Sequence, residues 1–373
     1  MNENSVRARI TVNRSHKERP WMIPAILLLG VGFSAAEAYA HAGLHPDVMR
    51  RAFIKSSSIN PETEASFRIA NGQQERSIQD FCNKLGKQFT KHGWESDPCG
   101  KIKWRATLQT VEKNPLLFAT FGEGTDITLL LSGVHPDEMT PVPMGFRLAR
   151  HLLENPQQIK PGQQVIIAPL VNPDGYLKDR PQRTNARGVD PNRNFFTLDW
   201  YEKSIAWWVE IRKRSLPHFP GHFPNSEIET VFQVRLIDEF QPDKILSIHA
   251  PLGFLDYDGP GDQKPKPLSP TETQARELAE AISRKANNYR VVDYSFYPGS
   301  LGNFAGNERH IPTITLELRS TDPEKVDEYW AQFMPGMLQA IDYPFKKTVE
   351  VNRNTQKFYS HYDELILKEK DRS

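Results

Sequence analysis

Short apolar runs alternate with helical segments through the middle of the chain, and this order restricts the fold more than any other feature. Runs typical of buried strands cover residues 116–121, 127–131, 165–171, 245–248 and 314–318. Helical spacing of apolar residues covers 76–91, 144–153 and 228–240, and a capping-box pattern at residues 269–272 opens a helix to about residue 286. Alternating strands and helices predict an α/β domain with a substantially parallel sheet.

The first 40 residues have the pattern of a secretory signal peptide. Five basic residues precede an apolar run at 22–33, and Ala38-Tyr39-Ala40 fits the rule for signal peptidase cleavage. The run is shorter than the ~20 residues that a membrane span needs. We therefore expect cleavage, export to the periplasm and no stable membrane span in the mature chain; an uncleaved anchor is the alternative.

Charge and cysteine content restrict the partners and the redox state. The formal net charge is only +1 and the basic residues are scattered, so we expect no nucleic-acid partner. The two cysteines, Cys82 and Cys99, both follow the export segment. An exported protein meets oxidising conditions, which favour a disulfide between them. Two unpaired, buried thiols are the alternative.

Four His-x-x-Glu pairs have a spacing that can supply two ligands to a catalytic zinc ion: His92/Glu95, His135/Glu138, His151/Glu154 and His361/Glu364. The first pair spans a glycine in the possible disulfide loop, the third lies within a helical stretch, and the fourth lies in a charged tail. The second pair closely follows the apolar run 127–131. Ligands bind beyond the carboxyl ends of strands in open α/β sheets, so the second pair is the expected one.

Two more strand-like runs end in residues suited to the same chemistry. The run 245–248 is followed by His249, and Glu317 lies within the otherwise apolar run 314–318. A buried carboxylate is costly unless it has a partner or a task. The structural alternatives are a core histidine bonded to the backbone and a salt bridge between Glu317 and Arg319. A single-zinc hydrolase needs three ligands and a nearby base, and these strand ends can supply both.

The ordered set of motifs resembles the zinc carboxypeptidases of the carboxypeptidase A type. His249 follows Glu138 by 111 residues, and Glu317 follows His249 by 68. Between them lie an Asn-Pro-Asp-Gly segment at 172–175, a segment at 183–195 that contains Gly-Val-Asp-Pro-Asn-Arg-Asn-Phe, and a family-like segment at 223–230. The resemblance covers about residues 105–340. It implies a mixed, largely parallel twisted sheet with helices on both faces.

The resemblance also implies a cofactor and a base. One zinc ion per chain would be held by His135, Glu138 and His249. Glu317 would accept a proton from the water that zinc activates and then donate it to the leaving amine. Arg183 would polarise the scissile carbonyl, although Arg187 lies close enough in the sequence to compete for that role.

Three further residues would hold the substrate. Asn192 and Arg193 would clamp its terminal carboxylate, for which a guanidinium fork is well suited. Tyr297 would cap the substrate, and Tyr294 is the alternative. Pro136 and Pro191 depart from the usual family residues, glycine and leucine, but neither replaces a functional side chain.

These assignments suggest four parts of the chain. They are a signal peptide at 1–40, an N-terminal region at 41–104 with the possible Cys82–Cys99 disulfide, a zinc carboxypeptidase catalytic domain at 105–345 and a charged C-terminal tail at 346–373.

Two segments, 255–260 and 297–302, resemble the murein peptide amidase subgroup of the family. That subgroup cleaves the γ-D-glutamyl–diaminopimelate bond of cell-wall peptides, and Asp256 or Asp258 would receive the extra amine of diaminopimelate. Both segments could instead be ordinary Gly/Pro turns. The alternative functions are a general peptide carboxypeptidase and a non-catalytic peptide-binding relative. A serine hydrolase is disfavoured, because the sequence around Ser300 is not a nucleophile elbow.

Overall fold

The structure is a computed structural model that describes residues 65–258, 268, 270–295 and 297–344. The predicted signal peptide and C-terminal tail lie outside these ranges. No helix among the described residues combines the length and the apolar character that a membrane span needs.

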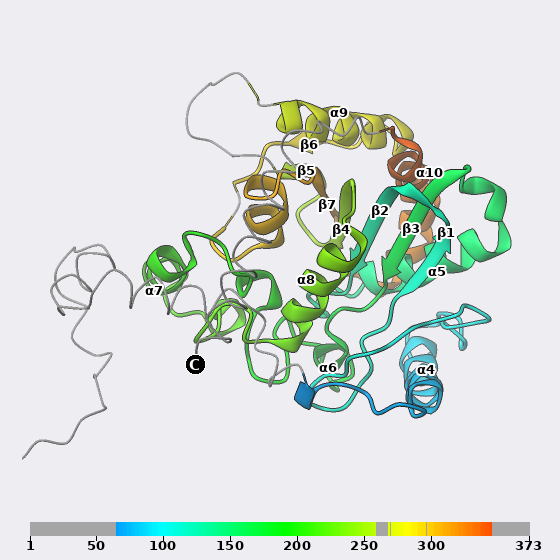
Figure 1. The fold of residues 1–373 in the computed structure, drawn as a ribbon, viewed down its shortest axis with the longest axis horizontal. Helices are drawn as coiled ribbons and strands as arrows, with labels where there is room; N and C mark the ends of the chain where they lie inside the picture. The colour runs from blue at the N-terminus through cyan, green and yellow to red at the C-terminus, as the bar shows by residue number, and fades with distance from the viewer. Residues whose placement is uncertain (1–64, 259–267, 269, 296, 345–373) are drawn as a thin grey trace, which may run out of the picture. The chain divides into compact units, whose positions relative to one another are not determined.

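The described residues form a seven-stranded sheet (Figure 1). The strands are β1 (Ala119–Gly122), β2 (Gly124–Ser132), β3 (Gly162–Ala168), β4 (Lys244–His249), β5 (Phe254–Asp258), β6 (Val291–Val292) and β7 (Thr313–Glu317). Their order is β1-β3-β2-β4-β7-β5-β6. Strands β3, β2, β4 and β7 are parallel, whereas β1 and β5 run antiparallel to β3 and β7. The sheet is therefore mixed and largely parallel, as predicted.

Helices cover both faces of this sheet. The main ones are α4 (Gln74–Thr90), α5 (Pro141–Glu154), α8 (Ile228–Phe240), α9 (Pro270–Lys285) and α10 (Val326–Asp342). Side chains from β2, β4 and β7 pack with α4, α5, α9 and α10 in one core, which includes Leu130, Leu246 and Leu316. The alternate side chains of β2 and β4 pack with α8 in a second core, which includes Leu129, Leu131 and Ile245. This alternation, period 2 along each strand, confirms the two-faced arrangement (Figure 1).

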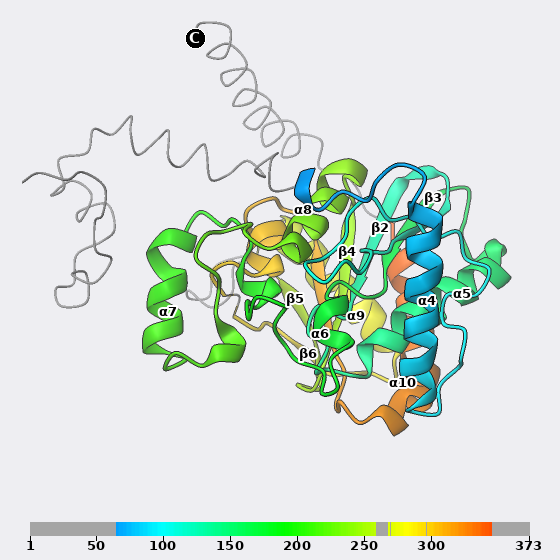
Figure 2. The same ribbon diagram turned by 90° about the horizontal axis from the view of Figure 1, so that it is seen from below.

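Shorter helical elements lie mostly in the connections that surround the site. They are α6 (Pro173–Tyr176), α7 (Ile205–Glu210), the π-helical turns η3 (Trp200–Ser204) and η5 (Gly302–Asn307), and the 3-10 turns η1 (Pro156–Gln158), η2 (Pro191–Arg193), η4 (Leu216–His218) and η6 (Pro323–Lys325). Figure 2 shows α7 at one end of the folded region and α4 towards the other side.

The described part of the predicted N-terminal region, residues 65–104, packs against the rest of the fold. The Cys82–Cys99 disulfide is present and joins α4 to the segment after it. Phe89 of α4 meets Phe146 of α5 edge to face, with ring centroids 5.7 Å apart. Residues 65–104 accordingly belong to the same compact unit as the sheet.

The Asn-Pro-Asp-Gly segment has a structural task. The Asn172 side chain accepts a hydrogen bond from Gly175 N–H and so caps α6. Asp174 is fully buried and accepts hydrogen bonds from the Thr110 hydroxyl and from the Asn114 amide. The segment thus ties α6 to the loop that precedes β1.

Several predicted boundaries were wrong. Of the run 116–121 only residues from Ala119 onward join β1, because residues 115 and 118 instead make isolated bridges with 109 and 105. Strand β3 ends at Ala168 and not at Val171. The segment 255–260, for which a turn was the alternative, contains most of β5. Helix α10 went unpredicted, and it contains Pro335.

Candidate active site

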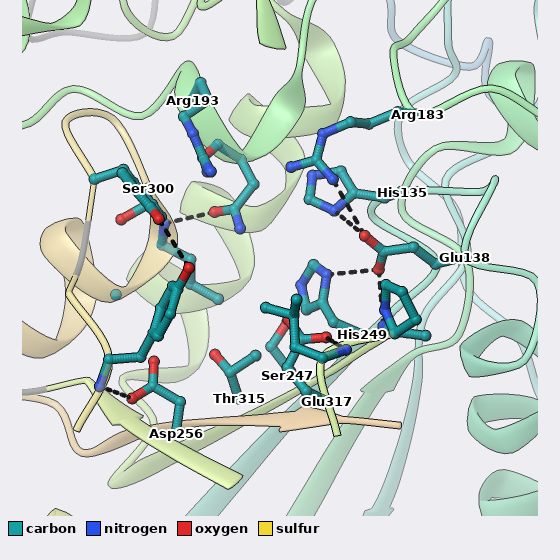
Figure 3. A pocket seen from close by; sticks show the side chains of 18 of the residues that line it. His135, Glu138, Arg183, Arg193, Ser247, His249, Asp256, Ser300, Thr315 and Glu317 are labelled. Atoms are coloured by element: carbon teal, nitrogen blue, oxygen red, sulfur yellow. Dashed lines mark hydrogen bonds and ion pairs between the residues drawn. The ribbon is translucent and has the colours of Figure 1, made fainter. Parts of the chain in front are cut away.

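Three neighbouring strands place the side chains of the site in two rows. His249 and Glu317 are the last residues of β4 and β7, and they lie opposite each other in the parallel register. Two residues earlier, Ser247 and Thr315 form the next pair on the same face, and Asp256 of β5 lies opposite Thr315. Because strand side chains alternate between faces, both rows point to one side of the sheet (Figure 3).

The three predicted metal ligands meet at this edge of the sheet (Figure 3). His135 and Glu138 follow β2, and their ligand atoms and that of His249 lie within 4.8 Å of one another in a buried cluster. Nδ1 of each histidine lies 2.9 Å from one of the two Glu138 oxygens. Two converging imidazole nitrogens and a carboxylate are the donor set of a catalytic zinc site with an open position. The cluster therefore fits a single zinc ion.

Charge holds this cluster together. Burial alone would raise the pKa of Glu138, but His135 and His249 hold that pKa well below its ordinary value. Glu138 Oε2 also accepts a hydrogen bond of 3.1 Å from the Ala250 N–H. The carboxyl group is thus kept ionised, which is the form that binds a metal.

Asp190, which the sequence analysis did not single out, orients the first ligand. Its Oδ1 lies 2.9 Å from Nε2 of His135, and its Oδ2 accepts a 2.9 Å hydrogen bond from Nε of Arg183. A carboxylate on the far nitrogen of a metal-binding histidine fixes its tautomer and raises its basicity. The signal for this residue was its place in the Gly-Val-Asp-Pro-Asn-Arg-Asn-Phe motif.

Arg183 lines the cavity, and its Nη1 lies 3.2 Å from Glu138 Oε1. Arg187, the alternative, donates instead to the Ser226 carbonyl at 3.5 Å, and its side chain is about half exposed. The structure therefore places the guanidinium of Arg183, and not that of Arg187, beside the cluster of predicted metal ligands.

Glu317 lines the same cavity as the three predicted metal ligands (Figure 3). Its Oε2 accepts a hydrogen bond of 3.3 Å from the Leu252 N–H. Burial raises the pKa of Glu317 and nearby Glu138 adds to the rise, whereas His249 opposes it. A higher pKa strengthens a carboxylate as a proton acceptor, which suits a general base.

The three predicted substrate-binding residues also line the cavity. Arg193 is almost completely buried, and its guanidinium carbon lies 4.5 Å from the ring centre of Tyr297. Asn192 accepts a 2.8 Å hydrogen bond from the Leu301 N–H, which fixes its side chain. Tyr294 lies in the same cavity, and its hydroxyl accepts a hydrogen bond of 3.2 Å from that of Tyr297. The capping role of Tyr297 therefore stays a prediction.

Gly299 joins the two loops that carry these residues. Its φ is +73°, and a Cβ atom here would lie 2.1 Å from the Arg193 carbonyl oxygen. The Gly299 carbonyl also accepts a hydrogen bond from the Phe195 N–H. The glycine is thus required for the close contact between the segment 297–302 and the segment of Asn192 and Arg193.

A buried pair of acidic residues anchors the loop that carries Arg183 and Asp190. The Asn185 amide donates to Glu227 at 2.7 Å and to Glu229 at 2.8 Å, at the start of α8. Burial raises the pKa of Glu229 to about 8. Two residues of the segment 223–230 therefore hold the loop that carries Arg183 and Asp190 in place.

This raised pKa predicts a stability change with pH. Folded Glu229 keeps its proton to about pH 8, whereas the unfolded carboxyl releases it near pH 4.5. Between these values the folded state binds more protons, so the free energy of unfolding should fall as pH rises, by up to about 1.4 kcal/mol per pH unit. Glu229→Gln should remove this slope. Urea unfolding at several pH values measures it, with exposed Glu239→Gln on the same helix as control; identical profiles for wild type and Glu229→Gln would contradict the assignment.

The site opens into a cavity of about 330 Å³. Arg193 and Arg183 lie on one side of it, and Ser247, Thr315 and Asp256 lie at its floor (Figure 3). The sequence analysis missed both hydroxyl residues. Each is a polar residue two positions before His249 or Glu317 in an apolar run, so period-2 spacing could have found them.

The competing His-x-x-Glu pairs contact residues away from the site or lie outside the described residues. Glu95 forms ion pairs with Arg147 and Arg150, so it serves the packing of α5. His151 lies on α5 with its ring 6.0 Å from that of Trp330. His361 and Glu364 lie outside the described residues.

Comparison with known proteins gives a family match over most of the chain. The family model described as zinc carboxypeptidase matches residues 106–358. The chain is 29% identical to murein peptide amidase A of Escherichia coli strain K12 over 213 residues, which is 57% of this chain and 78% of that protein. It is 30% identical to murein peptide amidase A of Vibrio campbellii over 208 residues, which is 55% of this chain and 74% of that protein.

Solved structures agree with the fold. Bovine thrombin-activatable fibrinolysis inhibitor superposes with a TM-score of 0.55 at 15% identity, over 72% of this chain and 96% of that one. Carboxypeptidase A from Helicoverpa armigera gives a TM-score of 0.54 at 15% identity, over 82% of this chain and 84% of that one. At such identity the likeness concerns the fold alone.

Proposed function

The chain belongs to the zinc carboxypeptidase family, and we propose that it hydrolyses the γ-D-glutamyl–diaminopimelate bond of murein peptides in the periplasm. The observation that carries this choice of substrate is Asp256, which is 5% exposed and lies on the floor of the cavity that also contains Glu317 and Arg193. Diaminopimelate offers a carboxylate to the arginine and an amine to the aspartate.

Zinc held by His135, Glu138 and His249 would supply a Lewis acid and lower the pKa of an attacking water. Glu317 would accept the proton of that water and pass it to the leaving nitrogen. Arg183 would donate hydrogen bonds to the carbonyl oxygen as negative charge develops there.

Arg193, Asn192 and Tyr297 would hold the terminal carboxylate and so set which bond reaches Glu317. A guanidinium fork suits this role because it can bind two carboxylate oxygens at once. Arg193 is held rigidly by its stacking on Tyr297, which limits the entropy lost when substrate binds.

The residues at the floor of the cavity support the proposal that the substrate carries an amine. Asp256 already accepts a 2.8 Å hydrogen bond from the Tyr294 N–H, which fixes its carboxylate. Ser247 is 1% exposed, and its hydroxyl has no hydrogen-bond partner among the described residues. An ammonium group donates up to three hydrogen bonds, and this floor offers a carboxylate and two hydroxyl oxygens. The other candidate, Asp258, ends β5, and its side chain lies outside the description.

The two relatives named above are murein peptide amidases, which agrees with this choice of substrate. The disulfide supports an oxidising compartment such as the periplasm, where murein lies. A general peptide carboxypeptidase remains the second candidate, since the metal cluster and Glu317 would serve it equally.

The test compares wild type and Asp256→Asn on two peptides. The first is L-alanyl-γ-D-glutamyl-meso-diaminopimelate, and the second ends in 2-aminopimelate, which keeps the side-chain carboxylate and lacks only the amine. Loss of a charge-assisted hydrogen bond should lower kcat/KM for the first peptide by about 10- to 100-fold, with little change for the second. Product release is followed by mass spectrometry. If wild type cleaves only ordinary L-peptides, the family assignment stands and the murein proposal fails.

A further inference from the structure

A second arginine, which the proposed reaction does not use, lines the cavity beside Arg193. Arg212 follows α7 in the segment that links η3 to α8. The Nε atoms of Arg193 and Arg212 are both buried and have no hydrogen-bond partner within the described part of the chain. Two guanidinium groups therefore border one cavity with unused donors.

Aromatic rings hold both groups in place. The Arg212 guanidinium carbon lies 4.9 Å from the ring centre of Trp207 and 5.9 Å from that of Tyr297. Arg193 contacts the same two rings, at 5.3 and 4.5 Å. The rings themselves lie 4.9 Å apart. Guanidinium groups stacked on aromatic faces are oriented before a ligand arrives, so little entropy is lost on binding.

Arg193 and Arg212 differ from Arg183 in their charge partners. Arg183 is paired with Glu138 and Asp190, whereas neither Arg193 nor Arg212 has an ion-pair partner within residues 65–258, 268, 270–295 and 297–344. Burial lowers the pKa of Arg193 to about 10; the charge of Asp190 opposes this decrease, and the charges of Arg183 and Arg212 add to it. The two positive charges border one cavity, and like charges repel more strongly where water is excluded. One bound carboxylate would satisfy one guanidinium and leave the other unpaired.

We propose that Arg212 binds a second carboxylate of the substrate, in addition to the terminal carboxylate held by Arg193. This inference rests on the proposed function, because a murein peptide offers two sources for that group. One is the carboxylate on the side chain of diaminopimelate, and the other is the free α-carboxylate of the γ-linked glutamyl residue. The shared chemistry is a carboxylate that an ordinary peptide ending in an apolar residue lacks.

The experiment crosses one substitution with two substrate changes. Three peptides are compared: the diaminopimelate tripeptide, the same peptide ending in L-lysine, and the same peptide with the glutamyl α-carboxylate amidated. Lysine keeps the amine and removes only the side-chain carboxylate. Arg212→Ala should lower kcat/KM for the first peptide by about 10- to 100-fold. It should have little further effect on the peptide that lacks the carboxylate bound by Arg212, and this coupling identifies the source.

Lys213→Ala removes a neighbouring, exposed positive charge and should leave all three rates unchanged. Zinc content and thermal unfolding of each variant establish that the fold is kept. Equal losses on all three peptides in Arg212→Ala would overturn the inference, because Arg212 would then serve the terminal carboxylate or the fold. If wild type cleaves only ordinary L-peptides, the murein proposal fails separately. The same cycle on peptides that end in 2-aminoadipate or its side-chain amide then decides the inference, and absence of coupling there overturns it.

Discussion

Glu317→Gln should lose about 10²- to 10⁴-fold in turnover while it keeps the zinc and much of the substrate affinity. Glutamine has almost the same shape, but its amide cannot accept a proton from water. Glu317 lies opposite His249 in the sheet and lines the cavity, but it is not one of the three clustered ligands. The substitution therefore separates proton transfer from metal binding.

Single-turnover and steady-state rates, together with metal content, measure this effect. Glu308→Gln is a matched control, since burial raises the pKa of Glu308 to about 7 and its side chain accepts a hydrogen bond from the Leu198 N–H. That variant should turn over normally. If Glu317→Gln does so as well, another group accepts the proton and the mechanism is wrong.

His249→Ala should lose most of the bound zinc and, with it, nearly all activity. The imidazole supplies one of three ligands, and two remaining ligands leave a divalent ion weakly held. The variant also leaves Glu138 with a single histidine partner in a buried cluster, so its carboxylate is less well compensated.

Metal analysis after dialysis against a chelator provides the measurement, with about one zinc per chain expected for wild type. His92→Ala is the control, because His92 belongs to a competing His-x-x-Glu pair and contacts the Trp94 ring at 4.9 Å. Full zinc retention in His249→Ala would mean that the metal is bound elsewhere.

The parallel core of the fold and the cluster of predicted metal ligands could be predicted from the sequence, because both are marked by apolar runs and by the residues that end them. Buried parallel strands read as continuous apolar runs, and a histidine or glutamate at the end of such a run stands out. His249 and Glu317 were recognised in this way. Strand β5 could not be recognised so simply, because Asp256 and Asp258 are residue types that strands disfavour. For Asp256, this cost is accepted where the strand borders the cavity.

Other parts of the site depend on contacts between distant segments. Arg212 has no local signal, since Trp207 and Tyr297, which orient it, are 90 residues apart in the sequence. Asp190 likewise reaches His135 across 55 residues. Periodicity reports which side of an element faces the core, but it does not report which loop side chains meet. Only the fold brings these groups together.

The two rows of side chains on β4, β7 and β5 set a fixed distance within the site. The row of Glu317 and the row of Asp256 are two residues apart along the strands, which is about 6.6 Å of strand rise. When the scissile bond lies at the row of Glu317, the side chain of the adjacent substrate residue extends towards the row of Asp256. Selection by length would then accompany selection by charge: an amine on a shorter side chain would stop above the floor, and changing the spacing would require a shift of a whole strand.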